Sequence, residues 1–436
     1  MTRLRRLIAT ALVDSFGLSL GWTVFSLQVV RDHGLAGLGL CNAAMLCGVA
    51  LSAPVAARLS SHLNGRALLR VTAATEAGLR IGTFVLLLAG APLAVVAVAV
   101  AASNVVAWTG YAGMRAEVAA ADPRGAAMTW YMVAVAAIEA AGTATAALLP
   151  TGPAQPVSGG LLVAVVAVYG ACLFPTWLVA GGARVPRAPR RTRPAGLGWS
   201  AGFGWPSGQG GSDGLGWLAG FRRSSGQGWS AGLGWPSGFQ RPSRRWRPAP
   251  LLASGGLVML LGSGPTLLAV GLAAELHGTR WVAGSALAFA LGSLVAPLAV
   301  ARLEQRAVPP SVAWPALGVG MVAGWAFAAS NPAALLAAQL LSGMCMSALE
   351  GDMDARVASR AHSPRGVTAG LANAAALRAF GSAAAVAIAP RVIADAGVGG
   401  LSVAFTTVLL TAMVLTLAWH RGRSALPGTG PAAHPG

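Results

Sequence analysis

Five ionisable side chains lie inside long apolar segments, where a charge is costly unless it is paired or used. They are Asp14, Glu76, Arg80, Glu139 and Arg378. Asp14 lies about two turns into the first apolar segment. Glu76 and Arg80 are four residues apart, a spacing that puts them on one helix face and favours an ion pair. We take these five residues as candidates for binding a small molecule or coupling its movement to protons, with a structural ion pair as the alternative for Glu76 and Arg80.

Glu139 and Arg378 hold matching places in the two halves of the chain. When the sequence is aligned on Gly142 and Gly381, the acid of one half falls at the position of the base in the other. The rise of a helix places Glu139 about 20 Å along its segment, near the middle of a membrane. We therefore predict that both residues flank a central cavity and contribute to substrate binding or coupling.

A second charged group lies at segment ends and in loops. Helical spacing puts Glu350 and Asp354 on one face and Asp352 on the other, so the three carboxylates would not converge on a metal ion. We expect them to pair with Arg356 or Arg360, or with the basic loop near residue 60. Such contacts would close the cytoplasmic side, and the candidates for them are Arg58, Arg66, Arg115, Glu350, Asp354 and Arg356.

Several kinds of catalysis have no support in the sequence. All 31 basic residues are arginine, so no lysine can bind a nucleotide phosphate or form a Schiff base. Gly-x-Ser-x-Gly occurs around Ser200, Ser212 and Ser230, but in a low-complexity stretch with no strand before it. The four cysteines lack metal-ligand spacing. We expect neither an enzyme nor a bound cofactor or metal.

The composition is that of a membrane protein. Hydrophobic residues make up 55% and charged residues 10%, against roughly 25% charged in soluble domains. The net charge of +18 could suggest a nucleic-acid partner. However, 26 of the 31 arginines fall in alternate gaps between the apolar segments, the pattern of cytoplasmic loops. We therefore expect a lipid bilayer and no nucleic acid as partner.

The apolar segments are long enough for helices that cross a bilayer. Their even number, with both termini cytoplasmic, predicts a multi-pass protein of the cell inner (plasma) membrane. The twelve predicted spans lie near residues 7–30, 35–57, 69–90, 93–114, 126–149, 159–180, 251–273, 280–301, 311–329, 333–353, 367–390 and 398–419.

Short motifs recur in the same order in the two halves of the sequence. Pro123-Arg124-Gly125 recurs as Pro364-Arg365-Gly366, with seven residues between the motif and a preceding arginine in each case, and His33-Gly34 recurs as His277-Gly278. Internal repeats of this kind are typical of secondary transporters. The predicted domains are an N-terminal six-helix bundle (1–181), a disordered Gly/Arg/Trp-rich cytoplasmic linker (182–249), a C-terminal six-helix bundle (250–420) and a disordered tail (421–436).

The span pattern, the central loop and the basic loops resemble the major facilitator superfamily (MFS) of secondary transporters, over nearly all of the chain except the linker and tails. The most specific matches are the two Pro-Arg-Gly loops, Gly65-Arg66 after the second span, and Arg378-Ala-Phe-Gly381, which is similar to a motif of bacterial exporters in that family.

This resemblance implies an all-α protein with two six-helix bundles and transport of a small molecule by alternating access. We expect efflux of a hydrophobic or amphiphilic compound by a monomer, coupled to protons, with Asp14 and Glu139 as the titrating candidates. A non-transporting membrane scaffold or sensor on the same fold is the alternative, and a membrane-embedded enzyme is the remaining one.

Overall fold

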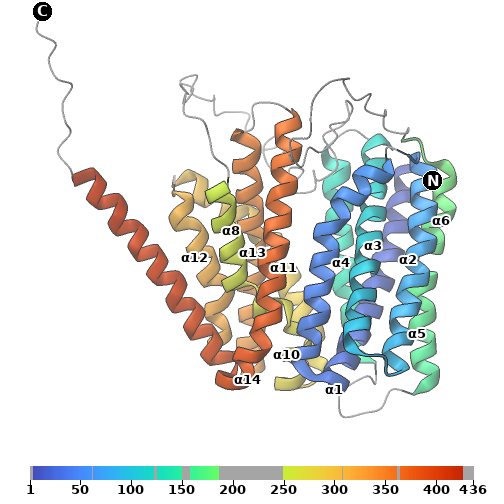
Figure 1. The fold of residues 1–436 in the computed structure, drawn as a ribbon, viewed down its shortest axis with the longest axis horizontal. Helices are drawn as coiled ribbons and strands as arrows, with labels where there is room; N and C mark the ends of the chain where they lie inside the picture. Colours follow the sequence, from blue (N-terminus) through green and yellow to red (C-terminus); the bar gives the residue numbers. More distant parts are fainter. Residues whose placement is uncertain are drawn as a thin grey trace, which may run out of the picture.

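The computed structural model describes residues 3–60, 62–121, 125–149, 158–185, 249–306, 308–360 and 364–425. All regular elements in these ranges are helices, and they form two bundles that lie side by side (Figure 1). The predicted all-α membrane fold is therefore confirmed. Most of the predicted linker, with its three serine motifs, and the end of the predicted tail lie outside the described residues.

The N-terminal half contains six crossings. The first two form one element, α1, which bends back at Gly34, where φ is 65°. The sixth is built from two α-helices and a 3-10 turn. The elements are α1 (Arg3–Ser60), α2 (Gly65–Leu88), α3 (Leu93–Ala121), α4 (Gly125–Leu148), α5 (Gly159–Ala171), α6 (Phe174–Val179) and η1 (Ala180–Gly182).

The C-terminal half also contains six crossings. Its last two form one element, α14, which bends at Gly397, where φ is 71°. Its first crossing is interrupted near Ser263 and Leu268. The elements are α8 (Ala249–Gly262), α9 (Gly264–Leu267), α10 (Ala269–His277), α11 (Arg280–Gln305), α12 (Pro310–Val322), η2 (Ala323–Phe327), α13 (Pro332–Arg360) and α14 (Pro364–Ala425).

Sharp turns join neighbouring crossings at one end of the molecule. Gly34, Gly90, Gly278 and Gly397 all have φ between 65° and 92°, a region that glycine enters without the steric cost of a Cβ. The bends of α1 and α14 lie at the end opposite the N-terminus (Figure 1). The matching dipeptides ending in Gly34 and Gly278 therefore adopt matching backbone conformations.

Equivalent contacts recur inside the two halves. A Cβ at Gly142 of α4 would lie 2.6 Å from Phe16 O of α1, and one at Gly381 of α14 would collide with the Gly256 backbone of α8. At the next position along each helix, Thr143 accepts a hydrogen bond from Thr23 (3.3 Å) and Ser382 accepts one from Ser263 (3.2 Å). The alignment of Gly142 with Gly381 thus corresponds to one packing arrangement used twice.

The two halves touch each other near the turn-bearing end. A Cβ at Gly39 of α1 would collide with Val386 O of α14, and one at Gly271 of α10 would lie 2.7 Å from Leu35 Cδ2. Asn42 donates a hydrogen bond to Leu267 O across the same boundary (2.8 Å). Small residues allow helices to approach this closely in a membrane.

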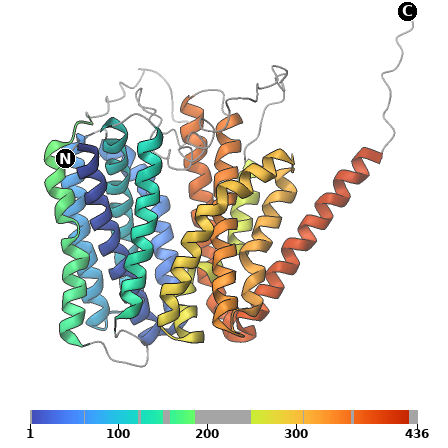
Figure 2. The ribbon, with the colours of Figure 1, turned by 180° about the vertical axis from the view of Figure 1, so that it is seen from behind.

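The outer surface is apolar. Val403, Val408, Val414 and Leu415, all on the last part of α14, are between 51% and 65% exposed. This part of α14 leans away from the bundle, as both views show (Figures 1 and 2). Seven of the described helices are long and apolar enough to cross a membrane, and acyl chains would cover such a surface.

Candidate functional site

A buried arginine on α2 organises the largest polar cluster of the N-terminal half. Arg80 is 1% exposed and forms ion pairs with Glu76 and with Asp14, 3.0 Å away on α1. It also donates to Tyr169 O (3.2 Å) and Cys172 Sγ (3.1 Å) on α5 and at its end. The predicted pairing of Glu76 with Arg80 is found, and the structure adds Asp14 as a second partner.

Close helix packing brings these partners together. A Cβ at Gly17 of α1 would lie 2.5 Å from Cys172, and one at Gly21 would collide with the Tyr169 ring. The missing side chains therefore let α1 lie directly against the sixth crossing. This places Asp14, less than one turn before Gly17, within reach of Arg80.

The cluster opens on one side into a small cavity. Its volume is about 20 Å³, roughly enough for one water molecule. Asp14 is 28% exposed, whereas the Arg80 side chain is 1% exposed. The Tyr131 hydroxyl and Thr176 Oγ1 are buried and have no hydrogen-bond partner among the described residues. A water, a hydrated proton or a small cation would find acceptors and donors here.

Glu139 is half-buried on α4, one turn before Thr143. No hydrogen bond or ion pair links its carboxylate to another residue in the part of the chain that the structure describes. Gly142 is three residues further along α4, on the same helix face, and it packs on α1. Glu139 therefore lies on the side of α4 near the first crossing. It is a carboxylate at membrane depth for which the described residues supply no ion-pair partner.

Arg378, the sequence counterpart of Glu139, has a different environment. It is 4% exposed on α14 and donates to both oxygens of Asp354 on α13, at 2.6 and 3.4 Å. Glu350 lies one turn earlier on α13, 4.0 Å from Arg378 Nε. Asp354 therefore pairs with Arg378 rather than with the expected Arg356, because the shared face of Glu350 and Asp354 points to α14. The side chain of Arg360, the other expected partner, lies outside the described residues.

Asp352 faces the other way, as helical spacing predicts. It accepts a hydrogen bond from Trp314 Nε1 of α12 (2.7 Å) and pairs with Arg356 one turn later (2.6 Å). Arg356 also donates to Val308 O (3.5 Å). Arg356 thus acts inside the C-terminal half, fixing the inner end of α13 to the loop before α12.

The other gate candidates are spread over the end of the N-terminal half that carries the N-terminus. Arg58, in the last turn of the second crossing, and Arg66, in the first turn of α2, are exposed. Arg115 was expected in a loop but is 2% exposed, because α3 continues to Ala121. Its guanidinium lies over the Tyr111 ring, 4.7 Å from the centroid.

The most connected acid of this region is Glu117, which the sequence did not single out. It is fully buried, pairs with Arg3 and accepts hydrogen bonds from the backbone N–H groups of Arg184 (2.9 Å) and Val185 (2.8 Å). A Cβ at Gly65 would collide with its carboxylate. The only sequence signal was an acid just past the predicted end of the fourth span.

The described residues contain no group of three His, Cys, Asp or Glu side chains arranged to hold a metal ion. Arginine–carboxylate ion pairs are the main charged contacts of both clusters, and Cys172 adds a thiol to the one around Arg80.

No family model matches the sequence, and no curated protein matches it. Solved structures do match over nearly the whole chain. The nucleoside transporter NupG has a TM-score of 0.60 at 10% identity, covering 96% of this chain and 99% of its own. The D-xylose-proton symporter has 0.61 at 13% identity, covering 95% and 96%. The human organic anion transporter MFSD10 has 0.55 at 16% identity, covering 94% and 99%.

Proposed function

Because the chain has the fold of the MFS transporters, we propose that it moves a small molecule across the membrane by alternating access of its two halves. In this mechanism the halves rock about a site near the membrane midplane. The structural match to the solved transporters, with TM-scores of 0.55 to 0.61, supports the fold, and the charge arrangement within the fold supports the motion.

The observation that carries the proposal is the contrast between contacts inside and between the halves. The ion pairs of Arg80, Arg378 and Arg3 each join residues of one half. Helices of the two halves pack on each other through α1 and α14, α4 and α11, and α1 and α10. Glycines allow close approach at the turn-bearing end, where Asn42 also donates a hydrogen bond to Leu267 O. Because no ion pair among the described residues joins the two halves, they can separate without exposing unpaired charges.

We propose protons as the coupling ion and Asp14 and Glu139 as the groups that bind them. Asp14 borders the cavity below Arg80, and Glu139 is half-buried without an ion-pair partner among the described residues. A carboxylate can couple transport only if it exchanges protons when its surroundings change. A buried carboxylate that accepts two hydrogen bonds from an arginine, such as Asp354, exchanges protons less readily.

For the cargo we propose a hydrophobic or amphiphilic compound moved outwards. An unpaired carboxylate at membrane depth favours a cargo with a cationic group, because the charge would find its partner there. The solved proteins of similar fold are a nucleoside transporter, an organic anion transporter and a D-xylose-proton symporter, so the fold leaves the cargo open.

The test uses purified full-length protein in liposomes loaded with ethidium, an amphiphilic cation, with and without a pH gradient. Wild-type protein should accelerate ethidium movement, and the gradient should increase the rate. Ethidium movement at the rate of empty liposomes, together with no counterflow, would contradict transport of this class of compound.

A glycine variant tests the rocking motion itself. Gly39→Val should hold the turn-bearing ends apart and abolish most of the transport, because its side chain would collide with Val386 O. Gly82→Val on α2 is the matched control, since a Cβ there meets no atom within 4 Å. Equal transport by both variants, at equal expression and thermal stability, would show that this contact does not need to close for transport, and would contradict its part in the rocking motion.

A further inference from the structure

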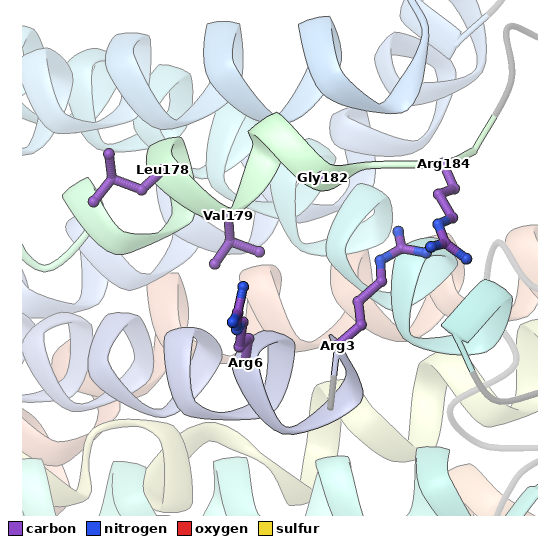
Figure 3. Close-up of a pocket in the computed structure, with 6 residues that line it drawn as sticks. All are labelled: Arg3, Arg6, Leu178, Val179, Gly182 and Arg184. Atoms are coloured by element: carbon purple, nitrogen blue, oxygen red, sulfur yellow. The ribbon is translucent and has the colours of Figure 1, made fainter. Parts of the chain in front are cut away.

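A second cavity lies away from the coupling candidates, at the inner end of the N-terminal half. Its volume is about 490 Å³, and it lies between the start of α1 and the end of the sixth crossing. The lining side chains are of two kinds, basic and apolar (Figure 3): Arg3, Arg6, Leu178, Val179, Gly182 and Arg184.

The arginines of this pocket are arranged for an anion. The side chains of Arg3 and Arg184 point toward each other (Figure 3), and Arg6 and Arg184 are exposed. Guanidinium groups repel at close range unless a negative charge lies between them. Glu117 neutralises one side of Arg3, yet Arg3 Nη1 is buried and has no hydrogen-bond partner among the described residues. The pocket therefore keeps a positive charge and an unused buried donor.

The pocket also continues into an apolar, aromatic surface. Leu178 is 53% exposed and Phe174 is 59% exposed, one turn apart on α6. Trp177 stacks on Phe174 and lies beneath the guanidinium of Arg70, 4.8 Å from the ring centroid. Tryptophan and arginine side chains beside an apolar surface are typical of the level of the lipid headgroups.

We propose that this pocket binds the phosphate of an anionic phospholipid of the inner leaflet, with the acyl chains along the exposed face of α6. Arginine binds phosphate oxygens through parallel hydrogen bonds, and basic pockets between spanning helices on the cytoplasmic side suit lipid headgroups. A free phosphate would satisfy the arginines equally but would leave the Phe174 and Leu178 surface unused.

The chain's own linker is a poor occupant of the same pocket. Residues 182–249 contain eleven arginines and a single acid, Asp213. A segment of this composition would bring positive charge to a pocket that is already positive. Charge complementarity thus favours an external anion.

A bound lipid would connect the membrane to the first and sixth crossings. Arg3 begins α1, which carries Asp14 eleven residues later, and Arg184 follows the crossing that supplies Tyr169 and Cys172 to Arg80. An anion shared by Arg3 and Arg184 would hold these two crossings together at their inner ends.

The experiment measures lipid binding on the purified full-length protein, by native mass spectrometry and by thermal unfolding in detergent. The probes are phosphatidylglycerol, phosphatidylcholine with the same acyl chains, and inorganic phosphate. Wild-type protein should bind the first phosphatidylglycerol tighter than phosphatidylcholine and unfold at a higher temperature with it, while inorganic phosphate should give no such rise. The first lipid should bind Arg6→Gln/Arg184→Gln about tenfold more weakly, since two charge-assisted contacts are lost.

The matched control removes two other exposed arginines, Arg5→Gln/Arg302→Gln, which lie outside the pocket. This variant should keep the wild-type preference for phosphatidylglycerol. Equal weakening in both variants would overturn the pocket as the site and leave only general surface charge. An equal rise in unfolding temperature with inorganic phosphate would overturn the lipid assignment in favour of a free anion. Because the readout is binding, it is independent of whether ethidium is transported.

Discussion

Each half of the molecule buries one arginine between two carboxylates, but the two clusters differ in how exposed their carboxylates are. Around Arg80, Asp14 remains 28% exposed and borders a cavity. In the cluster around Arg378, the Asp354 side chain is 5% exposed, and its two oxygens accept hydrogen bonds from the Arg378 guanidinium. The first cluster therefore has a carboxylate open to a cavity, as the proposed proton exchange requires, whereas the second joins two helices through fully buried groups. A buried ion pair at membrane depth therefore does not by itself identify a functional site.

The helices that carry the clusters differ as well. Arg80 connects the first, third and sixth crossings, whereas Arg378 connects the tenth and eleventh. The clusters are thus not copies of each other, although the surrounding packing of Gly142 and Gly381 is repeated. The helix contacts at these glycines are therefore repeated in the two halves, whereas the charge clusters are not.

The largest expected effect on stability concerns the feature that both clusters share, a buried arginine between carboxylates. Arg80→Leu and Arg378→Leu should each lower the free energy of unfolding by about 3–5 kcal/mol, because either change leaves buried carboxylates without their cation. Thermal unfolding of the purified proteins, with the exposed Arg31→Leu as control, measures it. If either variant unfolds at the wild-type temperature, its carboxylates do not depend on the arginine and the cluster is not an ion pair in the native protein.

An intermediate effect tests how they differ. Asp354→Asn should lower the free energy of unfolding by about 1.5–3 kcal/mol, because charged hydrogen bonds to Arg378 are lost. Asp14→Asn should cost about 1 kcal/mol or less, since Asp14 is partly exposed, while most of the pH-driven ethidium transport is lost. Measuring unfolding and transport on the same preparations separates the two roles. The reverse pattern, with Asp354→Asn losing proton coupling and Asp14→Asn losing only stability, would exchange the assignments.

The smallest effect on stability concerns the counterpart of Arg378. Glu139→Gln should change the free energy of unfolding by no more than about 0.5 kcal/mol, because no ion pair among the described residues depends on it. Ethidium transport should nevertheless fall. Glu275→Gln, at an exposed acid on α10, serves as the control. Comparable transport by Glu139→Gln and wild type, at equal expression, would remove Glu139 from the proposed site.

Much of the fold could be predicted from the sequence because the bilayer imposes simple rules. Apolar length gave the crossings, and matching residues such as Gly34 and Gly278 marked equivalent turns. Helical spacing correctly separated Asp352 from Glu350 and Asp354, and correctly paired Glu76 with Arg80. Periodicity within one helix is local, so it can be read without knowing the neighbours.

Partners on other helices could not be predicted in this way. Arg378 was expected beside a central cavity, but the packing of α13 against α14 gives it to Asp354. Arg115 was assigned to a loop and Glu117 was not singled out, because the hydrophobic pattern ends before the helix does. Which helices become neighbours depends on close contacts such as those at Gly17 and Gly21, and nothing in the sequence states which helix a glycine will meet.

The sequence by itself determined that this protein is an all-helical membrane chain with repeated halves, since span length, arginine placement and repeat motifs depend only on residue order and on the cost of moving charge into lipid. The tertiary structure decided which charges are paired, which carboxylate borders a cavity, and that three inner arginines surround a pocket. Those properties depend on distances between helices, and these are set by side-chain packing across the whole molecule.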